Sequence, residues 1–184
     1  MATIFESTIT AYKLACLEFI KQYKTFIHSH ISVMDTGHFM YHSEDIEKPF
    51  KYLSDVLHYA VVIYDTIEKE IISAEDKKYM SGIKCIDNMT KHQGEYKDYT
   101  LDNFVKPIPE ISTQIDQVIN EEDVIVSFHM SLKFIFQDIS NIESRYEEQK
   151  RNYMENICGK EANEVISKID KILKKYIDLG KIPQ

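Results

Sequence analysis

The chain has 184 residues, of which 43% are apolar, and carries a formal net charge of −8, so we expect one domain, residues 1–184, with a packed core. Five glycines and four prolines are too few for the many tight turns of a sandwich or barrel, so the elements should be long. The acidic charge is concentrated in residues 95–143, which disfavours nucleic-acid binding across the whole surface. Residues 144–184 carry a net charge of +2, which is compatible with a local nucleic-acid site there.

The first predicted helix runs from about Ile4 to His28. Its apolar side chains recur at alternating spacings of four and three residues, which places them on one face of a helix. A face this aromatic needs a partner surface, so the helix should pack along much of its length. The stripe consists of Phe5, Ile9, Tyr12, Cys16, Phe19, Tyr23 and Phe26. Residues 29–45, which include Gly37, break the pattern and are predicted to form a loop.

The second predicted helix begins near Ile46, with Pro49 in its first turn, where the missing N–H costs no internal hydrogen bond. Its stripe consists of Phe50, Leu53, Leu57, Ala60, Tyr64, Ile67 and Ile71. The segment from Ser73 to Asp76 resembles a capping box and opens a third helix. That helix should end near Gly94, which fits a C-terminal cap.

The remaining residues predict a connection over 95–109 and three further helices. The first is short, from Glu110 to Asn120, the second runs from about Glu122 to Gly159, and the last from Lys160 to Leu179. The second is predicted from apolar residues spaced three and four apart, namely Ile125, Phe128, Leu132, Ile135, Ile139, Ile142 and Tyr146. Together these stripes predict an all-α fold, a bundle of about five to six helices with near-antiparallel, up-down packing.

The cysteines and the N-terminus bear on location. Cys16, Cys85 and Cys158 are widely spaced and odd in number, which favours reduced, partly buried thiols over a disulfide framework. The first residues lack the pattern of a signal peptide, and no uncharged apolar run is long enough to span a membrane. We therefore expect a cytoplasmic protein that does not interact with membranes.

One motif suggests a family. The segment from Asp87 to His92 resembles the motif of HEPN domains, helical bundles found in ribonucleases of toxin–antitoxin and phage-defence systems. In that motif an arginine is followed by four residues, the first usually polar, and then by a histidine. Asn88 matches the polar position and His92 matches the histidine, whereas Asp87 stands in place of the arginine. The resemblance implies a cleft between two subunits, lined by Asn88 and His92.

The substitution at Asp87 bears directly on chemistry. Metal-independent RNA cleavage needs a group that moves protons and a cation that stabilises charge on the phosphate. An aspartate places negative charge where the reaction needs positive charge. Lys91, one turn further along the helix, compensates only in part because it lacks a planar guanidinium. We therefore expect a HEPN-like binding protein without catalysis, with a protein partner or a second copy of itself, and RNA as a further candidate partner. The alternative is a metal-independent ribonuclease with His92, Asn88 and Lys91 as catalytic residues.

A histidine cluster supplies a second alternative. Five of the seven histidines lie between residues 28 and 58, and His38 and His42 would share one face if their segment were helical. Gly37 breaks that segment and no established metal motif is present, so the metal-binding bundle stays an alternative and no cofactor is expected. His58, beside the stripe of the second helix, is predicted to be a partly buried core residue.

Overall fold

The computed structural model describes residues 3–27, 31–33, 39–40, 43–91, 100–118, 124–135 and 146–177. Within these residues it is mostly helical, which confirms the predicted all-α bundle of five to six helices. The helices are α1 (Ile4–Ile27), α2 (Ser43–Thr66), α3 (Ala74–Lys91), α4 (Leu101–Phe104), α5 (Glu147–Asn156) and α6 (Ala162–Ile177), with a short 3₁₀-helix η1 (Lys69–Ile71). The strands are β1 (Ile31–Val33), β2 (Phe39–Met40), β3 (Val105–Val118) and β4 (Val124–Phe134).

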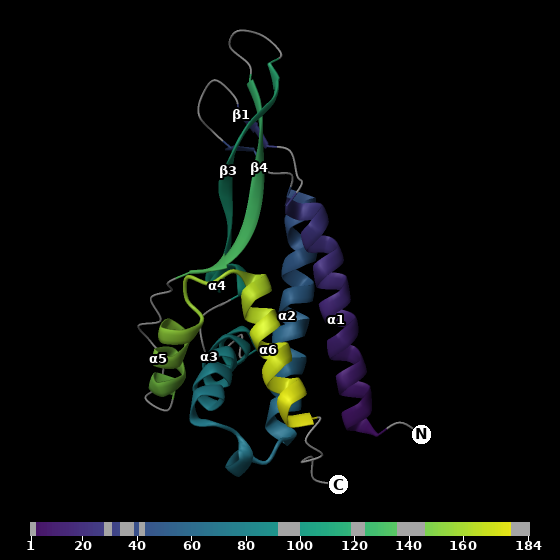
Figure 1. Cartoon of the computed structure of the whole chain (residues 1–184), viewed down its shortest axis with the longest axis vertical. Helices are drawn as coiled ribbons and strands as arrows, with labels where there is room; N and C mark the ends of the chain where they lie inside the picture. The colour runs from purple at the N-terminus through teal and green to yellow at the C-terminus, as the bar shows by residue number, and fades with distance from the viewer. Residues whose placement is uncertain are drawn as a thin grey trace.

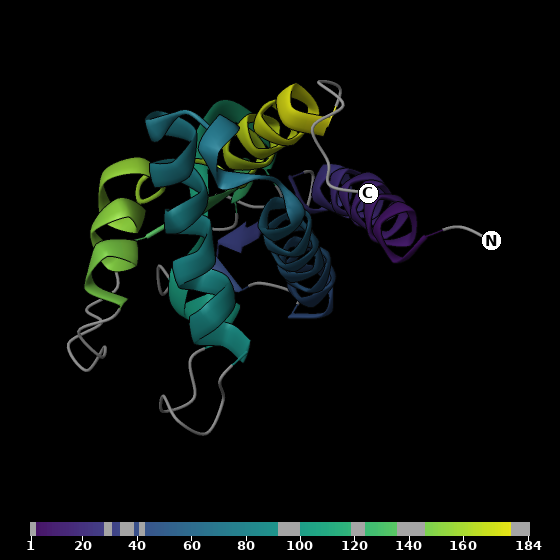
Figure 2. The same ribbon diagram turned by 90° about the horizontal axis from the view of Figure 1, so that it is seen from below.

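The helices form one body, from which a β-ribbon projects. In Figure 1, α1 and α2 run side by side in opposite directions, and α6 lies against α2. The helices α3 and α5 pack together, and α3 also contacts α2 (Figures 1 and 2). The paired strands β3 and β4 extend away from one end of this body (Figure 1).

The predicted apolar stripes of the first two helices face the core. Phe19 of α1 and Leu57 of α2 are fully or almost fully buried, and Tyr12 and Leu53 join them. Burial of such side chains stabilises a fold by roughly 1.5–3 kcal/mol each. The structure also places Pro49 inside α2, because this helix begins at Ser43 and not near Ile46. The stripes, and not the exact helix ends, were therefore the informative part of the pattern.

Two segments predicted as helices are strands. The segment Glu110–Asn120 falls largely in β3, and residues 124–134 of the helix predicted from Glu122 form β4, whereas its later part contains α5. The two strands pair antiparallel, with Val105 opposite Phe134 and Val118 opposite Val124. In the described sheet, whose order is β2-β1-β4-β3, the strand β3 lies at an edge. An edge strand tolerates the missing N–H groups of Pro107 and Pro109, which a helix interior would not.

The inner end of the ribbon is anchored in the core. Val105, Leu132 and Phe134 are buried, so these strand residues face the helices as a core stripe would. Gly159 adopts a φ of 83°, a left-handed conformation that favours glycine. Its N–H donates a hydrogen bond of 2.7 Å to the carbonyl oxygen of Phe134, which joins the turn after α5 to the end of β4.

Candidate functional site

Asp87, which the predicted motif aligns with an arginine, is an internal residue. Asp87 lies on α3 with only 4% of its side chain exposed, and its Oδ1 is 3.2 Å from Nδ1 of His58 on α2. A buried carboxylate needs a hydrogen-bond donor, because burial without one costs several kcal/mol. Since a carboxylate accepts and does not donate, Nδ1 of His58 carries the proton in this contact.

This pair forms part of a polar pocket between α2, α3 and the start of α4. The pocket has a volume of about 320 Å³ and is lined mainly by groups that form hydrogen bonds. Its lining residues are Ser54, Asp55, His58, Asp87, Thr90, Thr100 and Leu101. The carboxylates of Asp55 and Asp87 make it more acidic than basic, which disfavours a phosphate at this position.

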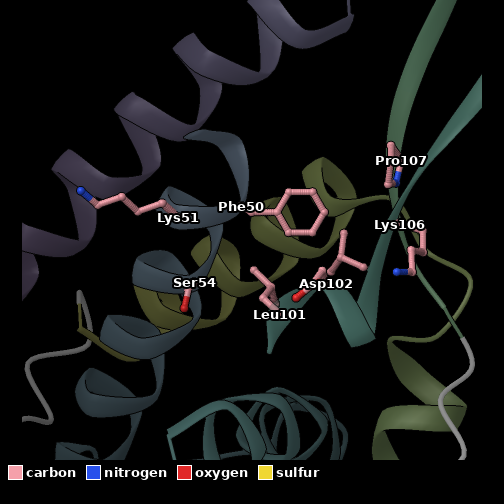
Figure 3. Close-up of a pocket in the computed structure, with 8 residues that line it drawn as sticks. Phe50, Lys51, Ser54, Leu101, Asp102, Lys106 and Pro107 are labelled. Carbon is pink, nitrogen blue, oxygen red and sulfur yellow. The ribbon is translucent and has the colours of Figure 1, made fainter. Parts of the chain in front are cut away.

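An apolar pocket lies beside the polar one. It has a volume of about 560 Å³ and shares Ser54 and Leu101 with the polar pocket. Figure 3 shows Phe50 and Leu101 beside this space, Pro107 of β3 bordering it, and Lys51 extending away. A ligand that filled both pockets would need an apolar portion next to a portion rich in hydrogen-bond donors.

The described residues of the polar pocket do not form an activated serine nucleophile. Ser54 lies one turn before His58 on α2, so both face the polar pocket. Among the described residues, however, no hydrogen bond joins the Ser54 hydroxyl to the His58 ring, a contact that activation of a serine requires. The pair is therefore better suited to hold a polar group than to start covalent chemistry.

The thiols are not candidates for nucleophiles either. Burial raises the pKa of Cys85 to about 12, so this thiol stays protonated near neutral pH. Burial also raises the pKa of Cys16 and that of Cys158 above their usual value. All three are free cysteines, as the sequence predicted.

Of the predicted catalytic residues, only Asn88 has a side chain that the structure describes. Asn88 donates a hydrogen bond of 3.0 Å from its amide to the Oε1 atom of Gln149 on α5. Lys91 is the last residue of α3, and its side chain is outside the described part of the structure, as is the whole of His92. Their predicted roles in catalysis remain untested predictions.

The predicted metal ligands also lie outside the described residues. His38 and His42 both fall in undescribed segments on either side of β2. Within the described ranges, no group of three histidine, cysteine or acidic side chains is arranged to hold a metal ion. The metal-binding alternative therefore stays a prediction about residues that the structure does not describe.

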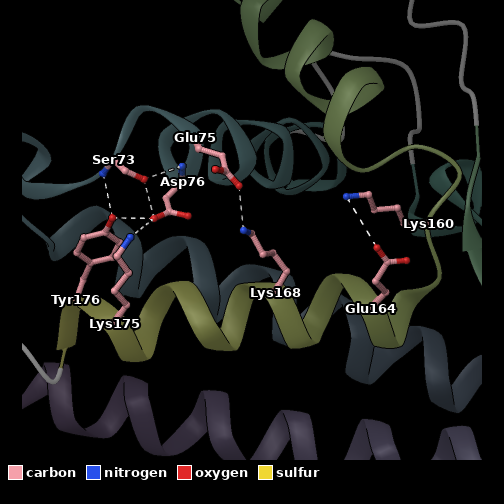
Figure 4. A network of polar contacts seen from close by, with 8 residues as sticks. All are labelled: Ser73, Glu75, Asp76, Lys160, Glu164, Lys168, Lys175 and Tyr176. Carbon is pink, nitrogen blue, oxygen red and sulfur yellow. Dashed lines mark hydrogen bonds and ion pairs between the residues drawn. The ribbon is translucent and has the colours of Figure 1, made fainter.

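A second polar cluster ties the start of α3 to the end of α6. The hydroxyl of Tyr176 donates to Oδ2 of Asp76 at 2.7 Å and accepts a bond from the backbone N–H of Ser73 at 2.9 Å (Figure 4). The ammonium group of Lys175 donates to the same carboxylate oxygen at 2.9 Å. The backbone N–H of Asp76 donates to the hydroxyl oxygen of Ser73 at 3.2 Å, which confirms the predicted cap of the third helix, and the Ser73 hydroxyl donates to Oδ2 of Asp76 at 2.8 Å. These contacts hold the start of α3 against the end of α6.

The pairing of His58 with Asp87 was not foreseen from the sequence. His58 is partly buried, as predicted, with 37% of its side chain exposed. Its partner is 29 positions away on another helix, and a single sequence gives no signal for a pair at that separation. The relation between the two residues arises from how α2 and α3 pack.

Comparisons with known proteins do not identify a family. The sequence matches no protein-family model, and no curated protein and no solved structure gives a significant match. Among the described residues, no helix has the length and apolar character needed to cross a membrane. The HEPN resemblance therefore rests on Asn88, His92 and the helical layout alone.

Proposed function

We propose that this chain is a HEPN-like helical binding protein that lacks ribonuclease activity. The observation that carries the proposal is the burial of Asp87 against His58. A residue in that place would have to present positive charge to an RNA phosphate, and Asp87 presents a buried negative group that is already bonded to a neighbour. The position serves the packing of α2 on α3.

The contact of Asn88 supports the same proposal. In the HEPN motif this polar position belongs to the catalytic face, but here the Asn88 amide is bonded to Gln149 of the same chain. A side chain that joins α3 to α5 is not free to position a substrate without losing that bond. Two of the three motif positions thus have a packing role.

The outer face of α1 supports binding to a protein partner. Leu14, Leu17 and Ile20 are 57%, 64% and 43% exposed, and they follow one another at a spacing of three along the helix. Figure 2 shows α1 at the margin of the helical body, so these side chains are accessible. Exposed apolar side chains grouped on one face are typical of interaction surfaces. We propose that a second copy of the chain covers this face.

The biological setting follows from the resemblance. HEPN-like proteins without the arginine would act in a phage-defence or toxin–antitoxin system through a homodimer or a protein partner. We propose the same setting, in the cytoplasm, for this chain. RNA is the alternative partner, bound without being cut.

An RNA cleavage assay tests the absence of catalysis. Single-stranded RNA is incubated with micromolar wild-type protein in the presence of a chelator, alongside the His92→Ala variant as the matched control. We expect intact RNA in both samples. Cleavage by the wild-type protein that disappears in His92→Ala would overturn the proposal in favour of a ribonuclease that uses His92 as proton donor or acceptor.

A further inference from the structure

A separate pocket lies where α3, α5 and α6 meet. It has a volume of about 360 Å³ and shares no lining residue with the pockets beside His58. Most of its lining side chains carry hydrogen-bond donors. These donors are Tyr79, Asn156, Lys160, Ser167, Lys168 and Lys171.

Tyr79 is the unusual residue of this pocket. Only 3% of it is exposed, and its hydroxyl is buried without a hydrogen-bond partner. Burial, with a smaller contribution from the nearby Glu164 carboxylate, raises the pKa of Tyr79 above its usual value, so the hydroxyl keeps its proton. Leaving such a group unpaired costs free energy, which a hydrogen-bond acceptor placed in the pocket would recover.

Cations surround this tyrosine. The ammonium groups of Lys160 and Lys168 lie 5.3 and 5.9 Å from the centre of the Tyr79 ring. Lys171, one turn after Lys168 on α6, is exposed and forms no ion pair with any described residue. Three lysines therefore line the same pocket as Tyr79, and two of them lie over its ring.

Two carboxylates partly offset this charge. Figure 4 shows Glu164 facing Lys160 and Glu75 facing Lys168, at nitrogen–oxygen distances of 4.0 and 3.1 Å. Both carboxylates are exposed at the surface, where ion pairs contribute little to stability. An anion in the pocket could therefore recruit these lysines at small cost.

We propose that this pocket binds the phosphate group of a small phosphate monoester. The Tyr79 hydroxyl and the three ammonium groups would donate to the phosphate oxygens, and Ser167 and Asn156 would complete the set. The volume falls in the range of small-molecule sites, whereas a nucleic-acid strand needs an extended groove. The site is independent of the proposed partner surface on α1.

Thermal denaturation and calorimetry test the proposal, with inorganic phosphate and adenosine monophosphate as probes and chloride at equal ionic strength as reference. We expect both probes to raise the Tm of the full chain. Tyr79→Phe and Lys171→Gln should weaken binding about tenfold, the usual scale for loss of one bond to a charged group. Lys13→Gln on α1, which also removes one exposed lysine, is the matched control and should bind normally.

The tyrosine variant separates a binding role from a structural one. Because its hydroxyl has no partner in the free protein, Tyr79→Phe should not lower the Tm measured without phosphate. A lower Tm would overturn the proposal, as would binding that is absent or equal in all variants. Binding of single-stranded RNA that depends on Lys171, with no response to either small probe, would also overturn it.

Discussion

The Nδ1 atom of His58 lies 3.2 Å from Oδ1 of Asp87, and this contact joins α2 to α3 at a polar pocket that both residues line. The partly exposed imidazole supplies a hydrogen-bond donor to this buried carboxylate. The position that would carry an arginine in a HEPN ribonuclease thus contributes to the stability of the fold.

Removing the carboxylate should destabilise the protein. Asp87→Ala takes away the partner of His58 and leaves a small cavity, so we expect the free energy of unfolding to fall by about 1–3 kcal/mol. Urea denaturation measures this change. In a double-mutant cycle with His58→Ala the two effects should not add. Asp55→Ala, on the wall of the same pocket, is the control, and an equal loss there would contradict a specific role for Asp87.

The tyrosine of the α3–α6 cluster offers a second test. Tyr176→Phe removes one hydroxyl that donates to Asp76 and accepts from Ser73, so we expect a loss of about 1–2 kcal/mol. Tyr52→Phe on α2, a partly buried tyrosine, is the matched control and should change stability by less than about 0.5 kcal/mol. Equal stability of the two variants in thermal denaturation would show that the cluster contributes nothing.

The same cluster predicts a pH dependence. Burial of the carboxyl opposes its ionisation, but the hydrogen bonds from Lys175, Tyr176 and Ser73 outweigh this and lower the pKa of Asp76 below its ordinary 3.8. A lowered pKa in the folded state stabilises the protein above the unfolded pKa, and this stabilisation is lost as pH falls through the folded pKa. The stability difference between wild type and Asp76→Asn should therefore be largest above about pH 4 and shrink on acidification. A difference that grows in acid would contradict this assignment.

The helical body could be predicted from the sequence because its core stripes have helical spacing. Phe19 and Leu57 are buried as the pattern of their helices requires. The β-ribbon was mistaken for helices because Ile125, Phe128 and Leu132 also fit a spacing of three and four. The decisive signal was the alternation from Val124 to Phe134, in which every second residue is apolar.

The candidate site was less accessible to sequence reasoning. The motif drew attention to Asp87, and its lack of an arginine indicated reduced catalysis, but its partner His58 lies on a different helix. The unpaired hydroxyl of Tyr79 likewise has no signature in the sequence, where this residue is one of twelve tyrosines. Such relations depend on tertiary packing, which periodicity does not encode.

Sedimentation equilibrium tests most directly whether this protein acts by binding a second copy through α1. Wild-type protein should sediment as a dimer at micromolar concentration, and Leu17→Glu should sediment as a monomer, because a charge would replace an apolar contact. Asn163→Glu, which adds the same charge at an exposed position of α6, should remain a dimer. A wild-type protein that is monomeric at all concentrations, or a Leu17→Glu variant that still dimerises, would contradict the account.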